Sequence, residues 1–184
     1  MGERYSFKEM MRGAMRRILF ALLFFIGSCT THQSYTLEVE EFGTVVVCGE
    51  FDRSLLMNNE QLQSWYQPRY NDYIVDTTLI PFIQQYANSV HYLIIVGTWC
   101  SDSKREIPHL LKILDAAKVS PQRIWLYGVD RTKTSNDGTT QKYRITNVPT
   151  IILMKEGKEI GRITEHPEET LEQDIVKILS AAKP

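Results

Sequence analysis

The pattern of apolar and polar residues is most regular after residue 90. Two runs, HYLIIVG (91–97) and RIWLYGVD (123–130), are mostly apolar, which predicts strands that are buried on both faces of a sheet. Residues 101–119 between them carry apolar side chains at helical spacing, so we expect an amphipathic helix that Pro108 interrupts. Its apolar stripe consists of Ile107, Leu110, Leu111 and Leu114.

The C-terminal part of the chain continues this pattern with a short helix, a hairpin and a final helix. Residues 136–145, NDGTTQKYRI, predict a polar turn and a short helix, and residues 148–163 predict a β-hairpin that turns at EGK. Residues 167–182 predict a helix with an acidic N-terminal end, as the helix dipole favours. The order βαβαββα indicates an α/β domain, in which a central mixed β-sheet is flanked by helices on both faces.

The preceding residues have shorter patterns. Residues 37–48, LEVEEFGTVVVC, alternate and are rich in β-branched side chains, so they predict a pair of strands that turns at Gly43. A helix is expected from Ser54, with Asp52 or Ser54 as its N-cap and Pro68 limiting its end. Helical spacing returns at residues 77–87, and no internal repeat or low-complexity segment occurs.

The N-terminus has the pattern of an export signal. Three arginines precede nine apolar residues at 18–26, too few to span a bilayer, which needs roughly 20. They suit the apolar core of a secretory signal. The following IGSC resembles a bacterial lipobox, in which Cys29 would be lipidated. A cleaved signal without lipid and an uncleaved anchor are the alternatives, and translation from Met15 would shorten the leader.

These patterns divide the chain into segments and place most of it outside the cytoplasm, on a lipid anchor facing the periplasm. We expect a lipoprotein-type signal peptide (1–28), a tether (29–36), an N-terminal extension (37–72) and the main domain (73–184). The composition is 43% hydrophobic and 23% charged with a formal net charge of -1, so it is globular and gives no support to a nucleic-acid partner.

Lipidation of Cys29 would leave two cysteines, Cys48 and Cys100. They could form one disulfide, or be one buried and one reactive thiol. Cys100 follows a predicted buried strand and begins a helix, where free N–H groups and the helix dipole stabilise a thiolate. Cys48 ends the run VVVC, as either a packed strand cysteine or a distant resolving partner of Cys100.

Two motifs add a specific resemblance. WCSDS at residues 99–103 stands at the first helix of the main domain, and VPT at residues 148–150 opens the hairpin about fifty residues later. Together with the element order and KEGKEIGRI, these motifs resemble the thioredoxin-like superfamily, with its W-C-x-x-C motif and cis-proline loop. The resemblance covers about residues 73–184, and exported thioredoxin-like proteins of Bacteroidetes-type bacteria are the most similar subgroup.

The resemblance implies roles for individual residues. Cys100 would be the attacking thiol, Trp99 a wall of the substrate groove, and Pro149 a cis-proline against Cys100. The backbone of Val148 would pair with an extended substrate segment. Ser103 occupies the position of the resolving cysteine, and its hydroxyl could donate a hydrogen bond to the thiolate.

Departures from the superfamily pattern limit this reading. With no thiol at position 103, a mixed disulfide is not resolved within the motif. Ile94 stands where many thioredoxins have a buried acid, and Asp102 would oppose a thiolate that Lys104 and Arg105 offset. The scattered histidines predict no metal site, and EHPEET around His166 is expected to be a solvated helix start.

Two functional hypotheses therefore stand beside each other. The first is a membrane-tethered protein that carries out single-thiol exchange with thiols or disulfides of exported proteins, without a cofactor. The second is a redox-inactive binding module that holds an extended peptide or a partner in the cis-proline groove. Copper handling is a weaker third hypothesis, because the paired cysteines and nearby histidine that it needs are missing.

Overall fold

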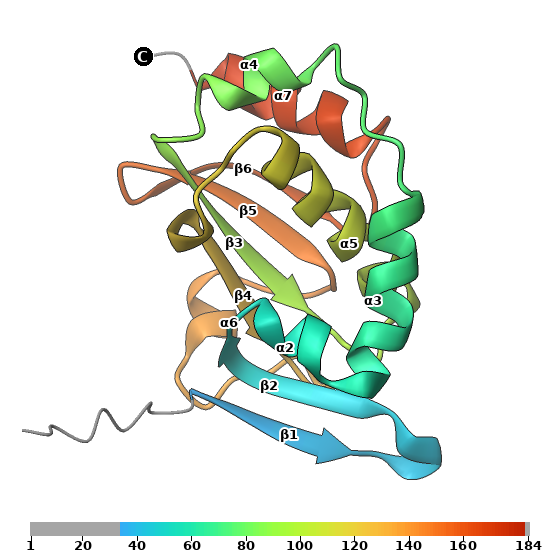
Figure 1. Cartoon of the computed structure of the whole chain (residues 1–184). Coiled ribbons are helices and arrows are strands. Elements are labelled where there is room, and N and C mark those ends of the chain that lie inside the picture. The colour runs from blue at the N-terminus through green and yellow to red at the C-terminus, as the bar shows by residue number, and fades with distance from the viewer. Residues whose placement is uncertain (1–33, 183–184) are drawn as a thin grey trace, which may run out of the picture. The chain divides into compact units, whose positions relative to one another are not determined.

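A six-stranded mixed sheet forms the centre of the chain (Figure 1), seen in a computed structural model that describes residues 34–182. The strands are β1 (Tyr35–Val39), β2 (Val45–Phe51), β3 (Val90–Val96), β4 (Ile124–Gly128), β5 (Thr150–Lys155) and β6 (Lys158–Thr164). Their order across the sheet is β1-β2-β4-β3-β5-β6. Strands β3 and β4 are parallel and all other neighbours are antiparallel, so the predicted mixed sheet is confirmed.

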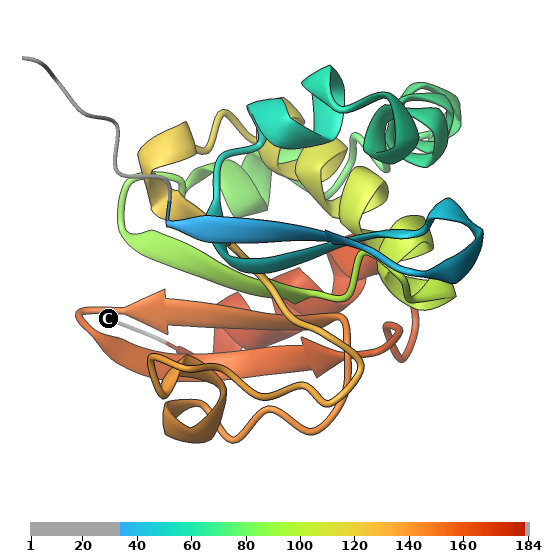
Figure 2. The same cartoon turned by 90° about the horizontal axis from the view of Figure 1, so that it is seen from below.

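Helices cover the two faces of this sheet unequally. They are α2 (Ser54–Asn58), α3 (Glu60–Asp72), α4 (Ile80–Gln84), α5 (Ser101–Ala116), α6 (Thr139–Lys142) and α7 (Leu171–Ala181), with 3-10 turns η1 (Glu41–Gly43) and η2 (Pro121–Arg123). Side chains of α2, α3, α4, α5 and α7 share one large apolar core with the sheet. Figure 2 shows α2 and α3, in teal, on one side of the blue and cyan strands β1 and β2.

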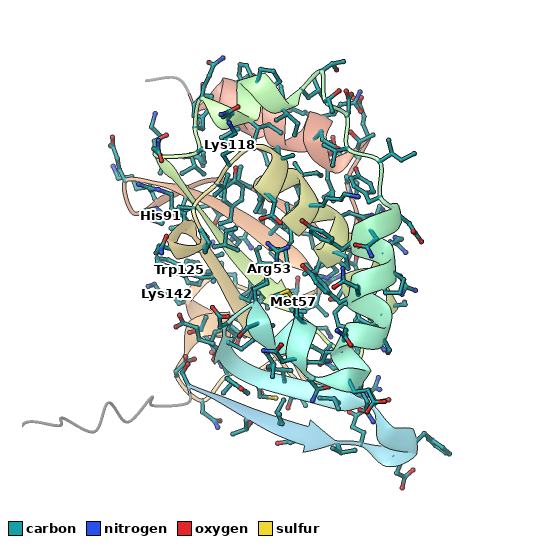
Figure 3. The ribbon with its side chains drawn as sticks, in the orientation of Figure 1. Arg53, Met57, His91, Lys118, Trp125 and Lys142 are labelled. Carbon is teal, nitrogen blue, oxygen red and sulfur yellow. The ribbon has the colours of Figure 1, made fainter. Side chains whose placement is uncertain are left out.

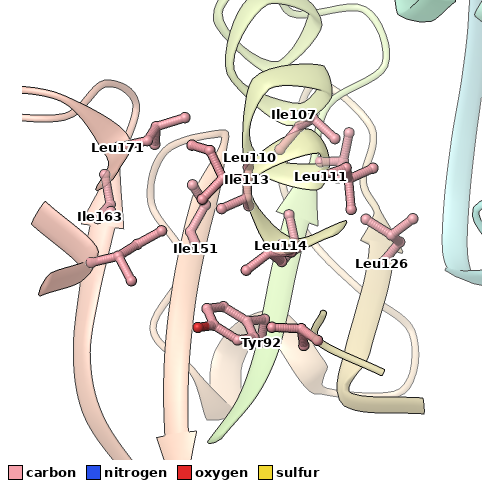
Figure 4. Packing of buried hydrophobic residues seen from close by; sticks show 14 of the residues in the cluster. Tyr92, Ile107, Leu110, Leu111, Ile113, Leu114, Leu126, Ile151, Ile163 and Leu171 are labelled. Carbon is pink, nitrogen blue, oxygen red and sulfur yellow. The ribbon is translucent and has the colours of Figure 1, made fainter. Parts of the chain in front are cut away.

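The large core follows from the apolar stripe that the sequence predicts for α5. Ile107, Leu110 and Leu114 are fully buried against strand side chains such as Leu126 and Ile151 (Figure 4). A smaller core on the opposite face contains side chains of β3, β4 and β5, with Trp99, Cys100, Tyr143 and Ile145 packed against it. Trp99 and Cys100, the first two residues of the motif, are therefore half-buried on the small core.

Contrary to the prediction, two prolines lie inside helices without ending or interrupting them. Helix α5 runs unbroken through Pro108, and α3 continues past Pro68 to Asp72. A proline removes one backbone donor, but the neighbouring bonds persist: the Tyr73 N–H still bonds to the Arg69 carbonyl at 3.2 Å. Burial of the apolar faces on either side outweighs the loss of a single hydrogen bond.

The helix predicted from Ser54 is divided into α2 and α3. Asn59 between them has φ −87° and ψ 120°, and its side chain accepts hydrogen bonds from the N–H groups of Gln61 and Leu62. An Asx cap of this kind starts a new helix. Asp52, a predicted cap, accepts a bond from the Ser54 N–H at 2.8 Å.

Strand β4 is less buried than its apolar run predicts. Trp125 is 41% exposed and stacks on His91 of β3, with ring centroids 5.5 Å apart (Figure 3). Helix α6 and the adjoining loops cover only part of this face of the sheet, because α6 spans a single turn. The remaining predicted strands and the final helix are observed, the latter with buried Glu172 and Asp174 in its first turn.

The strand pair assigned to an N-terminal extension is observed as β1 and β2, and it belongs to the central sheet. Strand β2 pairs with β1 on one side and with β4 on the other. The predicted signal peptide and Cys29 lie outside the described residues. Within residues 34–182, no helix is both long and apolar enough to cross a bilayer.

Candidate thiol site

Cys100 lies where β3 passes into α5. Its backbone N–H donates to the Gly97 carbonyl at 2.8 Å, and its own carbonyl accepts from the Lys104 N–H at 3.0 Å. It is therefore the N-cap residue of α5, with a half-buried side chain. Within the described residues, its sulfur makes no capping hydrogen bond with the N–H groups of the first helical turn.

The cis-proline loop contacts the same sulfur. The Val148–Pro149 peptide bond is cis, and the Cys100 Sγ lies 3.4 Å from the Val148 carbonyl oxygen. The Thr150 hydroxyl donates to the Asn147 carbonyl at 2.7 Å and holds the loop at the start of β5. Two motifs that lie far apart in the sequence thus meet at one thiol.

Gly97 makes this approach of the two segments possible. A Cβ at this position would lie 2.9 Å from Cγ2 of Val148 and 3.0 Å from the indole of Trp99. Contacts this short are repulsive for carbon atoms, whose optimal separation is about 3.5–4.0 Å. Any larger residue at this position would therefore require the side chain of Val148 or Trp99 to shift.

Trp99 is held by contacts that the sequence did not reveal. Its indole N–H donates to the Val129 carbonyl at 2.9 Å, and the Arg131 guanidinium lies 4.9 Å above its ring. Arg131 in turn forms a two-pronged ion pair with Glu40, whose pKa is lowered by that hydrogen-bonded contact. These two contacts hold the indole of Trp99 in one orientation.

Ser103 has a structural contact. Its side chain is fully buried, and its hydroxyl oxygen accepts the Gly97 N–H at 3.1 Å. Among the described residues, it has no hydrogen bond with Cys100, the contact that the sequence suggested. Ser103 thus connects α5 to the end of β3 and positions the loop that carries the thiol.

Of the two basic residues after Cys100, Arg105 forms ion pairs within the described chain and Lys104 does not. Arg105 bonds to Asp102 at 2.9 Å and to the buried Glu106 at 2.6 Å, so these charges largely compensate one another. Lys104 makes no ion pair or side-chain hydrogen bond with another residue of the described chain. Ile94 lies wholly in the large core, so the site has no carboxyl beneath the thiol at this position.

Cys48 and Cys100 are both free thiols. Val45 and Val47 face the large core, so the alternation of β2 turns Cys48 toward the opposite face, where Cys100 packs. Strand β4 separates β2 from β3, and burial, with the charges of Glu38 and Asp130, raises the pKa of Cys48. Cys48 is therefore a weaker nucleophile at neutral pH than an exposed cysteine.

Residues 34–182 contain no group of three or more histidine, cysteine, aspartate or glutamate side chains that could hold a metal ion. The site consists instead of a thiol, a cis-proline loop and a fixed indole. A family model described as Thioredoxin matches residues 49–179. The chain belongs to the thioredoxin family. The match begins at residue 49, within the predicted extension. The similarity of this thioredoxin-like protein to its family therefore starts before residue 73, where the resemblance of the motifs began.

Solved structures are similar to this chain at low sequence identity. A protein of unknown function from Pseudomonas aeruginosa is 14% identical with a TM-score of 0.57, over 73% of this chain and 94% of that one. A chain from the complex of ferredoxin:thioredoxin reductase with thioredoxin f2 is 18% identical with a TM-score of 0.32, covering 60% and 93%. No curated protein gives a significant match to the sequence.

Proposed function

We propose that this thioredoxin-like protein carries out single-thiol exchange on exported proteins, with Cys100 as its nucleophile. The supporting observation is the position of the Cys100 sulfur, which lies at the N-terminus of α5 and 3.4 Å from the Val148 carbonyl. An extended substrate that pairs with the backbone of Val148 would present its own sulfur at this place.

The exchange needs no internal partner thiol. The Cys100 thiolate attacks one sulfur of a substrate disulfide, a new S–S bond forms to Cys100, and the other substrate sulfur leaves as a thiolate. A second thiolate from solution then attacks the mixed disulfide, and Cys100 leaves as a thiolate again. Electrons pass only between sulfur atoms, so the cycle uses no cofactor.

A lipid anchor at Cys29 is part of this proposal. It is supported by the arginines, the apolar run at 18–26 and the IGSC sequence, all of which precede the described residues. An anchored exchange protein would act on thiols and disulfides of proteins outside the cytoplasm, where disulfides persist.

Adduct formation tests the chemistry directly. Reduced protein is mixed with an excess of a disulfide-bonded model peptide, and intact-mass spectrometry follows the covalent adduct. We expect wild-type protein to accumulate an adduct at Cys100, Cys100→Ser to form none, and Ser103→Cys to accumulate less because its second thiol releases the peptide. Equal adduct on wild type and Cys100→Ser would contradict the proposal.

The same measurement decides the role of Cys48. If an external thiol releases the peptide, Cys48→Ser leaves the lifetime of the adduct unchanged. If Cys48 is the resolving thiol, the adduct lasts longer in this variant, and a Cys48–Cys100 disulfide is found in the oxidised wild-type protein. The raised pKa of Cys48, which lowers its thiolate fraction at neutral pH, favours the first result.

The second function is a redox-inactive binding module in the same groove. The structural hydrogen bond between Ser103 and Gly97 favours it, because the residue at the resolving position then serves the fold and not the thiol. In this case, wild-type protein and Cys100→Ser would bind an extended peptide equally and neither would form an adduct.

A further inference from the structure

A cleft of about 450 Å³ opens between η1, α3 and the first turn of α5, the helix that Cys100 caps. Thr98 and Lys104, which line it, flank Cys100 in the sequence. The Thr98 hydroxyl donates to the Val45 carbonyl at 2.8 Å and accepts from the Val47 N–H at 3.1 Å. The floor of the cleft is therefore fixed to β2 at the point where the chain turns toward the thiol.

The charged residues that line this cleft are both cationic, Arg69 and Lys104, and no carboxylate is among its lining side chains. Lys104 has no acidic partner in the described chain, and the Arg69 guanidinium makes one bond, to the Trp65 carbonyl at 3.2 Å. Arg105, the next residue after Lys104, is already occupied by two carboxylates. The two cleft cations thus remain available to an anion from outside.

One wall of the same cleft is apolar. Leu62 and Trp65 of α3 line it from the helix side, and Phe42 stands at its rim with a fully exposed ring. An exposed aromatic ring beside a groove is typical of interaction surfaces, where its burial stabilises a complex. The cleft therefore combines cationic side chains with an apolar wall. One of the cations, Lys104, lies one helical turn after Cys100.

We propose that this cleft is a specificity subsite for an acidic segment of the substrate polypeptide, next to its reactive cysteine. A substrate carboxylate would bind Lys104 and Arg69, and a neighbouring apolar side chain would pack on the exposed ring of Phe42. The combination of charge and apolar wall favours a peptide over a small thiol. This inference rests on the proposed function, since it names the substrate class of the same thiol.

Three activated peptides test the subsite. They share one sequence, carry the cysteine as a mixed disulfide with pyridine-2-thiol, and have Glu, Gln or Lys two residues away. The Cys100 thiolate attacks the peptide sulfur, and pyridine-2-thione leaves and is followed by absorbance. At low ionic strength we expect the Glu peptide to react about three- to tenfold faster than the Gln peptide, and the Lys peptide to be slowest. The preference should weaken with added salt.

The variants Lys104→Gln and Arg69→Gln should each bring the Glu-to-Gln rate ratio toward one. Lys158→Gln is the matched control, because it removes one charge at the turn of the β5–β6 hairpin, away from the cleft. The ratio separates substrate recognition from a general effect of Lys104 on the thiol, which would change both rates equally.

Two outcomes would overturn the inference, and they differ in what else they affect. Equal rates for the three peptides with wild-type protein, but no reaction with Cys100→Ser, would remove the acidic subsite and leave the exchange activity in place. No reaction of wild-type protein with any of the peptides would remove the proposed function together with the subsite.

Discussion

Ser103 stands at the position where dithiol members of the superfamily carry their second cysteine. Here its hydroxyl oxygen accepts the Gly97 N–H in a fully buried environment. Ser103 therefore stabilises the fold at a position where the dithiol motif has a reactive cysteine. Trp99 shows the converse, because a residue expected to be a passive wall is fixed by Val129 and Arg131.

The contact of Ser103 leads to a prediction about stability. Ser103→Ala leaves the buried Gly97 N–H without a partner, which costs about 1–3 kcal/mol of the free energy of unfolding. Urea denaturation of the reduced protein measures it, with Ser101→Ala as the control, since Ser101 is exposed at the start of α5. If the two variants unfold at the same midpoint, the buried hydrogen bond is not stabilising.

At the scale of elements, the break between α2 and α3 sets the shape of the cleft. Asn59 ends one helix and caps the next, so α3 begins at Glu60 and brings Leu62, Trp65 and Arg69 to the cleft. A single continuous helix from Ser54 would direct these side chains elsewhere, because the helix axis would not change at Asn59.

The cap predicts an asymmetry between two neighbouring asparagines. Asn59→Ala removes the acceptor of the Gln61 and Leu62 N–H groups and should lower the free energy of unfolding by about 1 kcal/mol. Asn58→Ala, at the exposed last position of α2, should change it by less than about 0.5 kcal/mol. Equal effects in thermal or urea unfolding would contradict the role of Asn59 as a cap.

At the scale of the whole molecule, β2 is an interior strand of the sheet. It lies between β1 and β4, and it contributes Val45, Val47 and Phe51 to the large core. Thr98 adds two hydrogen bonds between β2 and the loop before Cys100. The residues assigned to an extension thus support the domain that carries the thiol.

This arrangement predicts the result of truncation. A chain that starts at residue 34 should unfold cooperatively, whereas one that starts at residue 73 loses β1, β2, α2 and α3 and should not fold. The exposed edge of β4 and the uncovered core residues would favour aggregation. Circular dichroism and gel filtration distinguish the two chains. A folded, monomeric chain from residue 73 would support the predicted boundary at that residue and contradict this expectation.

Local patterns were enough for the parts of the fold that depend on neighbouring residues. The continuous apolar run at 91–97 gave β3, the stripe of Leu110 and Leu114 gave α5, and the hairpin followed from its EGK turn. Each pattern reports the burial of one element, which is set by side chains a few positions apart. The sequence also placed Cys100 at a helix start and VPT at a strand start, and so indicated the superfamily.

Tertiary structure alone decided the contacts between distant residues. Arg131 meets Glu40 over 91 positions, and Thr98 meets Val45 over 53. The cleft likewise needs η1, α3 and α5 to come together. No local period encodes such pairings, because they depend on the order of strands across the sheet. The sequence by itself therefore determined that Cys100 stands at a helix start, and only the tertiary structure decided that the Val148 carbonyl lies against its sulfur, because that contact joins segments 48 positions apart.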